Sequence, residues 1–78
     1  MSLSKTVAQN LFAVRTARKL SQSAVADAAG VSVSYISMLE RAQRSPPLQT
    51  LEAVAKALRV SPMDLVQDSR GRPRSRPR

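Results

Sequence analysis

The sequence has no cysteine and no histidine, and its aromatic residues are limited to one phenylalanine and one tyrosine. Disulfide bonds, thiol or imidazole catalysis and zinc sites built from these residues are therefore excluded. Leucine, valine, isoleucine and alanine must fill the interior instead. No apolar run is long enough to cross a bilayer or to act as a signal peptide, so we expect a cytoplasmic protein without a membrane partner.

Acidic residues are also scarce, because five Asp and Glu stand against 13 Lys and Arg, for a net charge of +8. The last ten residues contain five Arg and no acid, so the charge is concentrated at the C-terminal end. This distribution indicates a polyanionic partner, either nucleic acid or an anionic membrane surface. The acids are scattered and no phosphate-binding glycine loop occurs, so we expect no enzyme, no catalytic residues, no metal and no cofactor.

Apolar residues recur at helical spacing, and no segment alternates as a strand would. The pattern predicts a compact all-α domain over residues 1–68, with helices at 5–19, 22–29, 33–41, 48–58 and a short one from Pro62. The expected N-caps are Ser4, Ser21, Ser32 and Ser61. After Asp68 no hydrophobic residue remains, so we expect residues 69–78 to form a disordered Arg/Pro-rich basic tail.

The segment from Gln22 to Arg41 predicts two short helices joined by a tight turn. Ala26 is small where the two helices would cross, and Gly30 can adopt the left-handed conformation that ends the first of them. This helix-turn-helix geometry lets a second helix, starting near Val33, project from the domain into the major groove of DNA.

The stretch from Leu11 to Val66 resembles the Xre/Cro-type helix-turn-helix family of phage repressors, restriction–modification controller proteins and related regulators. The most specific matches are Leu20-Ser21-Gln22, Gly30-Val31-Ser32, Ser34-Tyr35-Ile36-Ser37, Leu39-Glu40-Arg41 and Leu58-Arg59-Val60-Ser61. The resemblance implies a five-helix lambda-repressor-like domain that binds a pseudo-palindromic double-stranded DNA operator as a homodimer. Such a protein would be a nucleoid-associated transcriptional repressor or autoregulator. The alternative is an antitoxin, which represses its operon with the same fold and also binds a toxin.

The resemblance also implies roles for individual residues. The positions that match base-reading residues are Val33, Ser34, Tyr35, Ser37 and Met38. The positions that match phosphate-binding residues are Gln22, Arg41, Gln43 and Arg44, and Gln22 would also support the recognition helix. Arg15 and Glu40 match an ion pair that ties the first helix to the end of the third. Arg18 and Lys19 either form a solvated helix end or contact phosphate.

The sequence departs from the family pattern at the ends of two helices and at one base-reading position. Lys19 and Ala42 replace glycines that commonly end the first and third helices, so we expect less tightly turned ends there. Val33 stands where many relatives carry a polar or basic residue. Valine can contact a thymine methyl group but cannot donate a hydrogen bond, so base discrimination would rest on fewer polar groups.

Several apolar residues have two plausible locations. We expect Phe12 in the core, with the fifth helix or a second subunit as the alternative contact. Met63, Leu65 and Val66 belong either to the core or to a dimer interface, because family dimers often associate through this helix.

The basic tail contains Arg70-Gly71-Arg72-Pro73, which reproduces the core of an AT-hook. Arg70, Arg72 and Arg74 would either enter a narrow A·T minor groove or attract phosphates without specificity. In both cases the tail should steepen the salt dependence of DNA binding, because each neutralised phosphate releases counterions.

Overall fold

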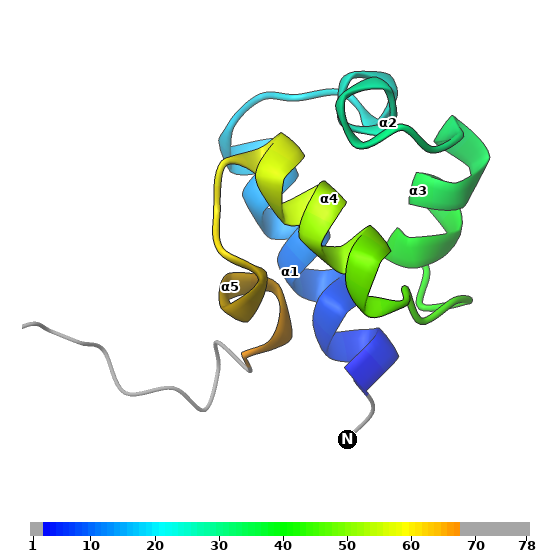
Figure 1. The fold of residues 1–78 in the computed structure, drawn as a ribbon, viewed down its shortest axis with the longest axis vertical. Helices are drawn as coiled ribbons and strands as arrows, with labels where there is room; N and C mark the ends of the chain where they lie inside the picture. Colours follow the sequence, from blue (N-terminus) through cyan, green and yellow to red (C-terminus); the bar gives the residue numbers. More distant parts are fainter. Residues whose placement is uncertain (1–2, 68–78) are drawn as a thin grey trace, which may run out of the picture.

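The computed structural model describes residues 3–67, which form five helices and contain no strand. The helices are α1 (Leu3–Ala17), α2 (Gln22–Ala29), α3 (Val33–Glu40), α4 (Leu48–Leu58) and α5 (Pro62–Val66) (Figure 1). The predicted all-α fold is confirmed, and helix bounds differ from the sequence expectation mainly in α1. This helix begins before Ser4, so Ser4 is not its N-cap, and its hydroxyl lies against that of Ser45 instead.

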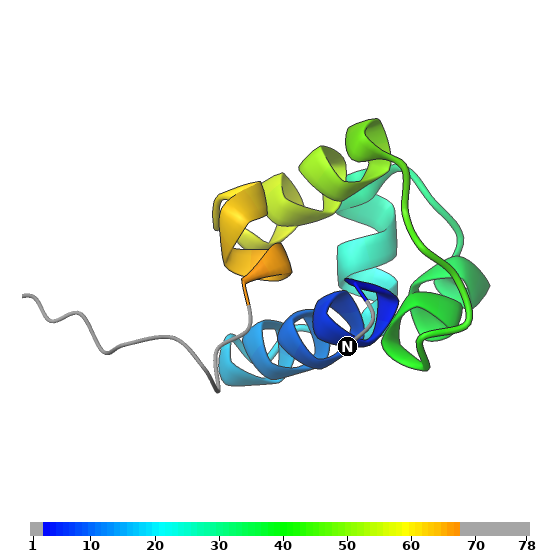
Figure 2. The same cartoon turned by 90° about the horizontal axis from the view of Figure 1, so that it is seen from below.

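The hydrophobic core draws on every helix, and its largest fully buried side chains are Leu11, Ile36, Leu39, Leu58, Leu65, Val25 and Val54. α1 packs against α3 and α5, whereas α2 packs against α3 and α4. In Figure 2, α1 and α4 run along opposite sides of the domain and α2 lies across between them. Both views place α3 and α5 at opposite ends. Within residues 3–67 no helix combines the length and the apolar character needed to cross a membrane.

The first four helices all end in the same hydrogen-bonded turn. In each, a backbone N–H just past the helix donates to the carbonyl five residues back in the chain instead of continuing the helical pattern. The pairs are Leu20 to Arg15 (3.0 Å), Val31 to Ala26 (3.0 Å), Gln43 to Met38 (2.9 Å) and Val60 to Ala55 (2.9 Å). This is the Schellman motif, which usually brings an apolar residue onto the core just past the helix. Leu20, Val31 and Val60 do pack there.

In each of these turns, the residue immediately before the donor of the hydrogen bond has a positive φ, a conformation that favours glycine. Gly30 (φ 74°) meets this requirement, but Lys19 (58°), Ala42 (60°) and Arg59 (63°) adopt the same conformation without being glycine. The expectation of looser ends at Lys19 and Ala42 is therefore wrong. After Lys19 and Arg59, packing of Leu20 and Val60 against the core favours the turn. The backbone cost is about 1 kcal/mol at each non-glycine residue.

Side chains also fix the helix starts and the position of α5. The Ser21 hydroxyl accepts a hydrogen bond from the Ala24 N–H (2.9 Å), and the Ser32 hydroxyl accepts one from the Tyr35 N–H (3.0 Å). Both serines are thus confirmed as N-caps. At the start of α5, the Asp64 carboxylate accepts the Ser61 amide at 3.0 Å.

A contact that the sequence did not reveal holds α5 against α1. The buried amide of Asn10 donates to the carbonyls of Leu65 (2.9 Å) and Gln67 (2.7 Å). A lone asparagine on a helix is usually exposed, so it gave no signal of this role.

Candidate nucleic-acid interface

α2 and α3 form a helix-turn-helix unit whose second helix has two distinct faces. Ile36 and Leu39 are 0% and 1% exposed and anchor α3 in the core. At 100° per residue, Ser34, Ser37 and Met38 fall on the side of the helix away from Ile36 and Leu39, and Val33 lies at the edge of that side. Val33 is 43% exposed and Ser34 is exposed, whereas Ser37 and Met38 are half-buried. The structure thus brings four of the five expected base-reading residues onto one face.

Tyr35, the fifth expected base reader, lies on the flank of α3 and packs partly against the core. Its hydroxyl, like those of Ser34 and Ser37, makes no hydrogen bond to any other residue in the 3–67 range. These three hydroxyl groups therefore remain available to a ligand.

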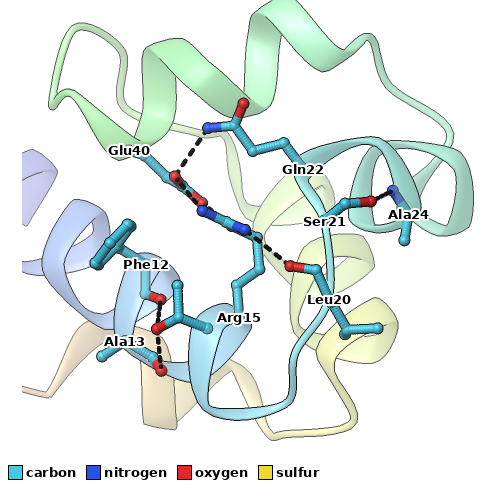
Figure 3. A network of polar contacts seen from close by, with 9 residues as sticks. Phe12, Ala13, Arg15, Leu20, Ser21, Gln22, Ala24 and Glu40 are labelled. Atoms are coloured by element: carbon cyan, nitrogen blue, oxygen red, sulfur yellow. Dashed lines mark hydrogen bonds and ion pairs between the residues drawn. The ribbon is translucent and has the colours of Figure 1, made fainter.

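A polar network fixes the end of α3 to the rest of the domain (Figure 3). Arg15 on α1 forms a bidentate ion pair with Glu40. Its Nε donates to Oε2 at 2.5 Å and its Nη2 donates to Oε1 at 3.1 Å. The same guanidinium donates from Nη1 to the Leu20 carbonyl at 2.8 Å. Gln22, the first residue of α2, donates from Nε2 to Glu40 Oε1 at 2.9 Å.

The network is largely shielded from solvent, since the Arg15 and Glu40 side chains are only 12% and 6% exposed. It places the expected pair in contact and joins α1, the α1–α2 loop, α2 and α3 at one point. A partly buried ion pair holds geometry best when both partners have further hydrogen bonds, and here Arg15 and Glu40 each take part in three. The orientation of α3 is therefore set by charge as well as by apolar packing.

Apart from Gln22, the expected phosphate-binding residues of the domain border this unit on two sides. Arg41, Gln43 and Arg44 are exposed directly after α3, and Arg18 and Lys19 are exposed between α1 and α2. Within the part of the chain that the structure describes, none of these five side chains has a hydrogen bond or an acidic partner. The tail residues Arg70, Arg72 and Arg74 lie outside the described residues.

Phe12 is 53% exposed, so its expected place in the core is wrong. The core face of α1 is formed by Val7, Leu11 and Val14, and Phe12 is one position out of that register. Its ring lies instead beside the guanidinium of Arg15, whose Cζ is 5.5 Å from the ring centroid.

The three apolar residues of α5, which were expected either in the core or at a dimer interface, differ in their burial. Leu65 is fully buried within the single chain, which corrects its assignment to a dimer interface. Val66 packs partly against the core, and Met63 is 57% exposed. Only Met63 and the exposed part of Val66 remain accessible to a partner.

Comparison with known proteins identifies the same unit. The sequence profile of the helix-turn-helix family matches residues 11–65. An immunity repressor protein of Bacillus phage phi105 is 47% identical over 55 residues, covering 70% of this chain and 38% of that repressor. The control protein C.SmaI of Serratia marcescens is 36% identical over 61 residues, covering 78% of this chain and 73% of that protein.

Among solved structures, the restriction-modification controller protein C.AhdI from Aeromonas hydrophila superposes with a TM-score of 0.77 at 35% identity. The match covers 80% of this chain and 94% of the controller protein. This chain spans well under half of the phage repressor's length, so the correspondence there concerns one domain. The family match, these relatives and the geometry of α2 and α3 agree, and the chain belongs to the helix-turn-helix family, among its Xre/Cro-type transcriptional regulators.

Proposed function

We propose that this protein is a sequence-specific regulator of transcription that binds double-stranded DNA as a homodimer, with α3 in the major groove, and represses its target. The observation that carries the proposal is the difference between the inner and outer faces of α3. Its inner face and its end are fixed by the core and by Glu40, while hydroxyls on its outer side have no partner among residues 3–67.

Base recognition on this surface would rest on short side chains. Ser34 and Ser37 can each donate or accept a hydrogen bond at a base edge, and Val33 can contact a thymine methyl group. Met38 adds apolar contact on the same face, and Tyr35 reaches the sugar–phosphate at the flank. Because no side chain on α3 forms a bidentate contact with guanine, part of the specificity comes from DNA shape and half-site spacing.

Phosphate contacts would position α3 and supply most of the affinity. Gln22 gives one amide N–H to Glu40, which leaves its second N–H for a phosphate oxygen next to the recognition helix. Arg41, Gln43 and Arg44 would bind the backbone on the other side. Arg18 and Lys19 would add attraction at the edge of the interface, and Arg70, Arg72 and Arg74 would do so from the tail.

A homodimer would place two copies of α3 about 34 Å apart, in successive major grooves of a pseudo-palindromic site. Met63 supports this arrangement, because a methionine that is 57% exposed on a short C-terminal helix suits an apolar contact between subunits. The repressor role is supported by the phage immunity repressor, which is 47% identical to this chain over the shared domain.

Selection of bound sites from a pool of random DNA duplexes tests this proposal. We expect enrichment of an inverted repeat whose half-sites lie about one helical turn apart. Failure to enrich any sequence over the starting pool would refute sequence-specific binding. Enrichment of a single half-site, bound by one chain, would refute the homodimer alone.

The same selection with Arg70, Arg72 and Arg74 replaced by alanine separates the tail from the folded domain. We expect the same repeat, weaker binding and a shallower dependence of affinity on salt. An unchanged salt slope would show that the tail makes no phosphate contact. Loss of A·T-rich flanks from the selected sites would indicate minor-groove insertion.

A further inference from the structure

An open hollow of about 620 Å³ lies on the domain away from α3. Its walls are the C-terminal ends of α1 and α4 and one side of α2. The lining residues are Ala17, Arg18, Leu20, Ala24, Ala28, Ala57, Leu58 and Arg59. In Figures 1 and 2 the adjoining ends of α1 and α4 lie on the opposite side of α2 from α3. No residue of the recognition helix contributes to this surface.

Alanines form much of the lining of the hollow, and the accessible lining as a whole is divided about equally between polar and apolar atoms. Four of the eight lining residues are alanine, and their short side chains leave space above the buried Leu58. A volume of this size falls in the range of small-molecule sites, which run from about 300 to 1,000 Å³. The alanine side chains offer no hydrogen-bonding group, so this part of the lining suits a short hydrocarbon group.

The rim is positively charged, and its lining contains no acid. Arg18 and Arg59 border the hollow, and Lys19 lies between two of the lining residues. None of these three cations has a hydrogen bond or an ion pair with another residue between 3 and 67. Their charge complements an anion, and the planar guanidinium group matches a carboxylate or phosphate with paired N–H groups.

Backbone strain gives Arg59 a second distinguishing feature. It ends α4 with φ 63°, a conformation in which glycine would relieve the strain but would remove the guanidinium. Ala42 ends α3 with φ 60° and has no functional group to keep. The two positions therefore form a matched pair, because glycine relieves the same strain at both and removes a rim cation only at Arg59.

We propose that the hollow binds a small amphipathic anion, with a carboxylate or phosphate head between Arg18 and Arg59 and a short alkyl body on the lining alanines. The site shares no residue with α3, and Arg59 has no part in the proposed DNA interface, whereas Arg18 stands at the edge of both. The protein would thus carry a ligand site on the face opposite its recognition helix.

Titration of the ¹⁵N-labelled full chain with octanoate and with octyl phosphate, followed by NMR, tests the proposal without DNA. We expect saturable shifts of amide signals from residues 17–20, 24–28 and 57–60. Whichever head group binds more tightly identifies the oxyanion. Acetate carries the charge without the alkyl body and octanol carries the body without the charge, so both should bind at least tenfold more weakly.

Two glycine variants provide the decisive comparison. Arg59→Gly should weaken octanoate or octyl phosphate binding about tenfold, as expected for loss of a charge-assisted hydrogen bond. Ala42→Gly should leave it unchanged, and both variants should unfold at higher temperature than the parent, so a loss of binding cannot be attributed to unfolding.

Several outcomes would overturn the proposal. These are the absence of saturable shifts with both amphiphiles, equal binding of acetate and octanoate, equal binding of octanol and octanoate, or unchanged affinity in Arg59→Gly. Failure of the DNA selection would not affect this result, because the titration contains no DNA.

Discussion

The two faces of α3 differ in what surrounds them. The inner face has Ile36 and Leu39 in a closed core, and Glu40 at its end is held by Arg15 and Gln22. The outer face has Val33, Ser34 and Ser37, with no hydrogen bond from either serine to another residue described here. Interactions that stabilise the fold and groups that are available to DNA are thus separated on a single helix of eight residues. Substitutions on the two faces should consequently have different effects.

Leu39→Ala should have the largest effect, because it opens a cavity at a position that is 1% exposed. We expect a loss of about 3 kcal/mol in the free energy of unfolding, measured by urea denaturation. Val33→Ala, on the outer face, is the control and should change this free energy by about 0.5 kcal/mol or less. Similar losses at both positions would contradict the separation of the two faces.

Glu40→Gln should have the next largest effect, because it leaves the shielded guanidinium of Arg15 without its counter-charge. The amide keeps the size of the side chain and part of its hydrogen bonding, so we expect a loss of about 2 kcal/mol. Glu52→Gln, at an exposed position of α4, should have almost no effect.

A double-mutant cycle with Arg15→Met tests whether the loss arises from the pair itself. If the effects of Glu40→Gln and Arg15→Met simply add in thermal or urea unfolding, the network does not couple α1 to α3. Strong coupling would show that the orientation of the recognition helix depends on this contact.

Ser34→Ala and Ser37→Ala should leave stability within about 0.5 kcal/mol of the parent, because their hydroxyls support no other described residue. In a homodimer each substitution removes two hydrogen bonds to bases, so the preference for selected over random DNA should fall about tenfold. Competition binding at fixed salt measures this ratio. An equal loss of affinity on both DNAs would place the serines on the phosphate backbone instead.

Ala42→Gly should have the smallest effect and the opposite sign, because it relieves the positive φ at the end of α3. We expect a gain of about 1 kcal/mol in thermal unfolding experiments. Gly30→Ala is the reciprocal change and should cost about 1 kcal/mol, since an added Cβ would meet no atom within 4 Å and only the backbone would be strained. A destabilised Ala42→Gly protein would mean that the left-handed turn there carries no strain.

Much of the fold could be predicted from local patterns. The 3.6-residue spacing of apolar side chains located the helices, Ser21 and Ser32 marked two starts, and Gly30 marked the tight turn. These signals act within one or two turns of helix, so they do not depend on distant parts of the chain. The outer face of α3 follows from the same periodicity once its inner residues are known.

Prediction was wrong where neighbouring helices decide the outcome. Phe12 is adjacent in sequence to core residues, but α3 and α5 leave its side of α1 uncovered. Leu65 could have faced a second subunit, and the packing of α5 against α1 and α4 buries it within one chain. Asn10 acquires its role only because the end of α5 brings two carbonyl groups within reach.

The sequence by itself determined an all-helical domain with a helix-turn-helix, because helix periodicity and capping are local properties. The family resemblance added the prediction that the recognition surface lies on α3. The tertiary structure alone decided how the helices without a terminal glycine end and what lies between the helices. Lys19 and Arg59 adopt a conformation that glycine favours because core packing of Leu20 and Val60, which follow them, outweighs the local strain. Ala42 adopts the same conformation. The cation-rimmed hollow exists only because the ends of α1 and α4 meet beside α2, although they are some 40 residues apart in the chain.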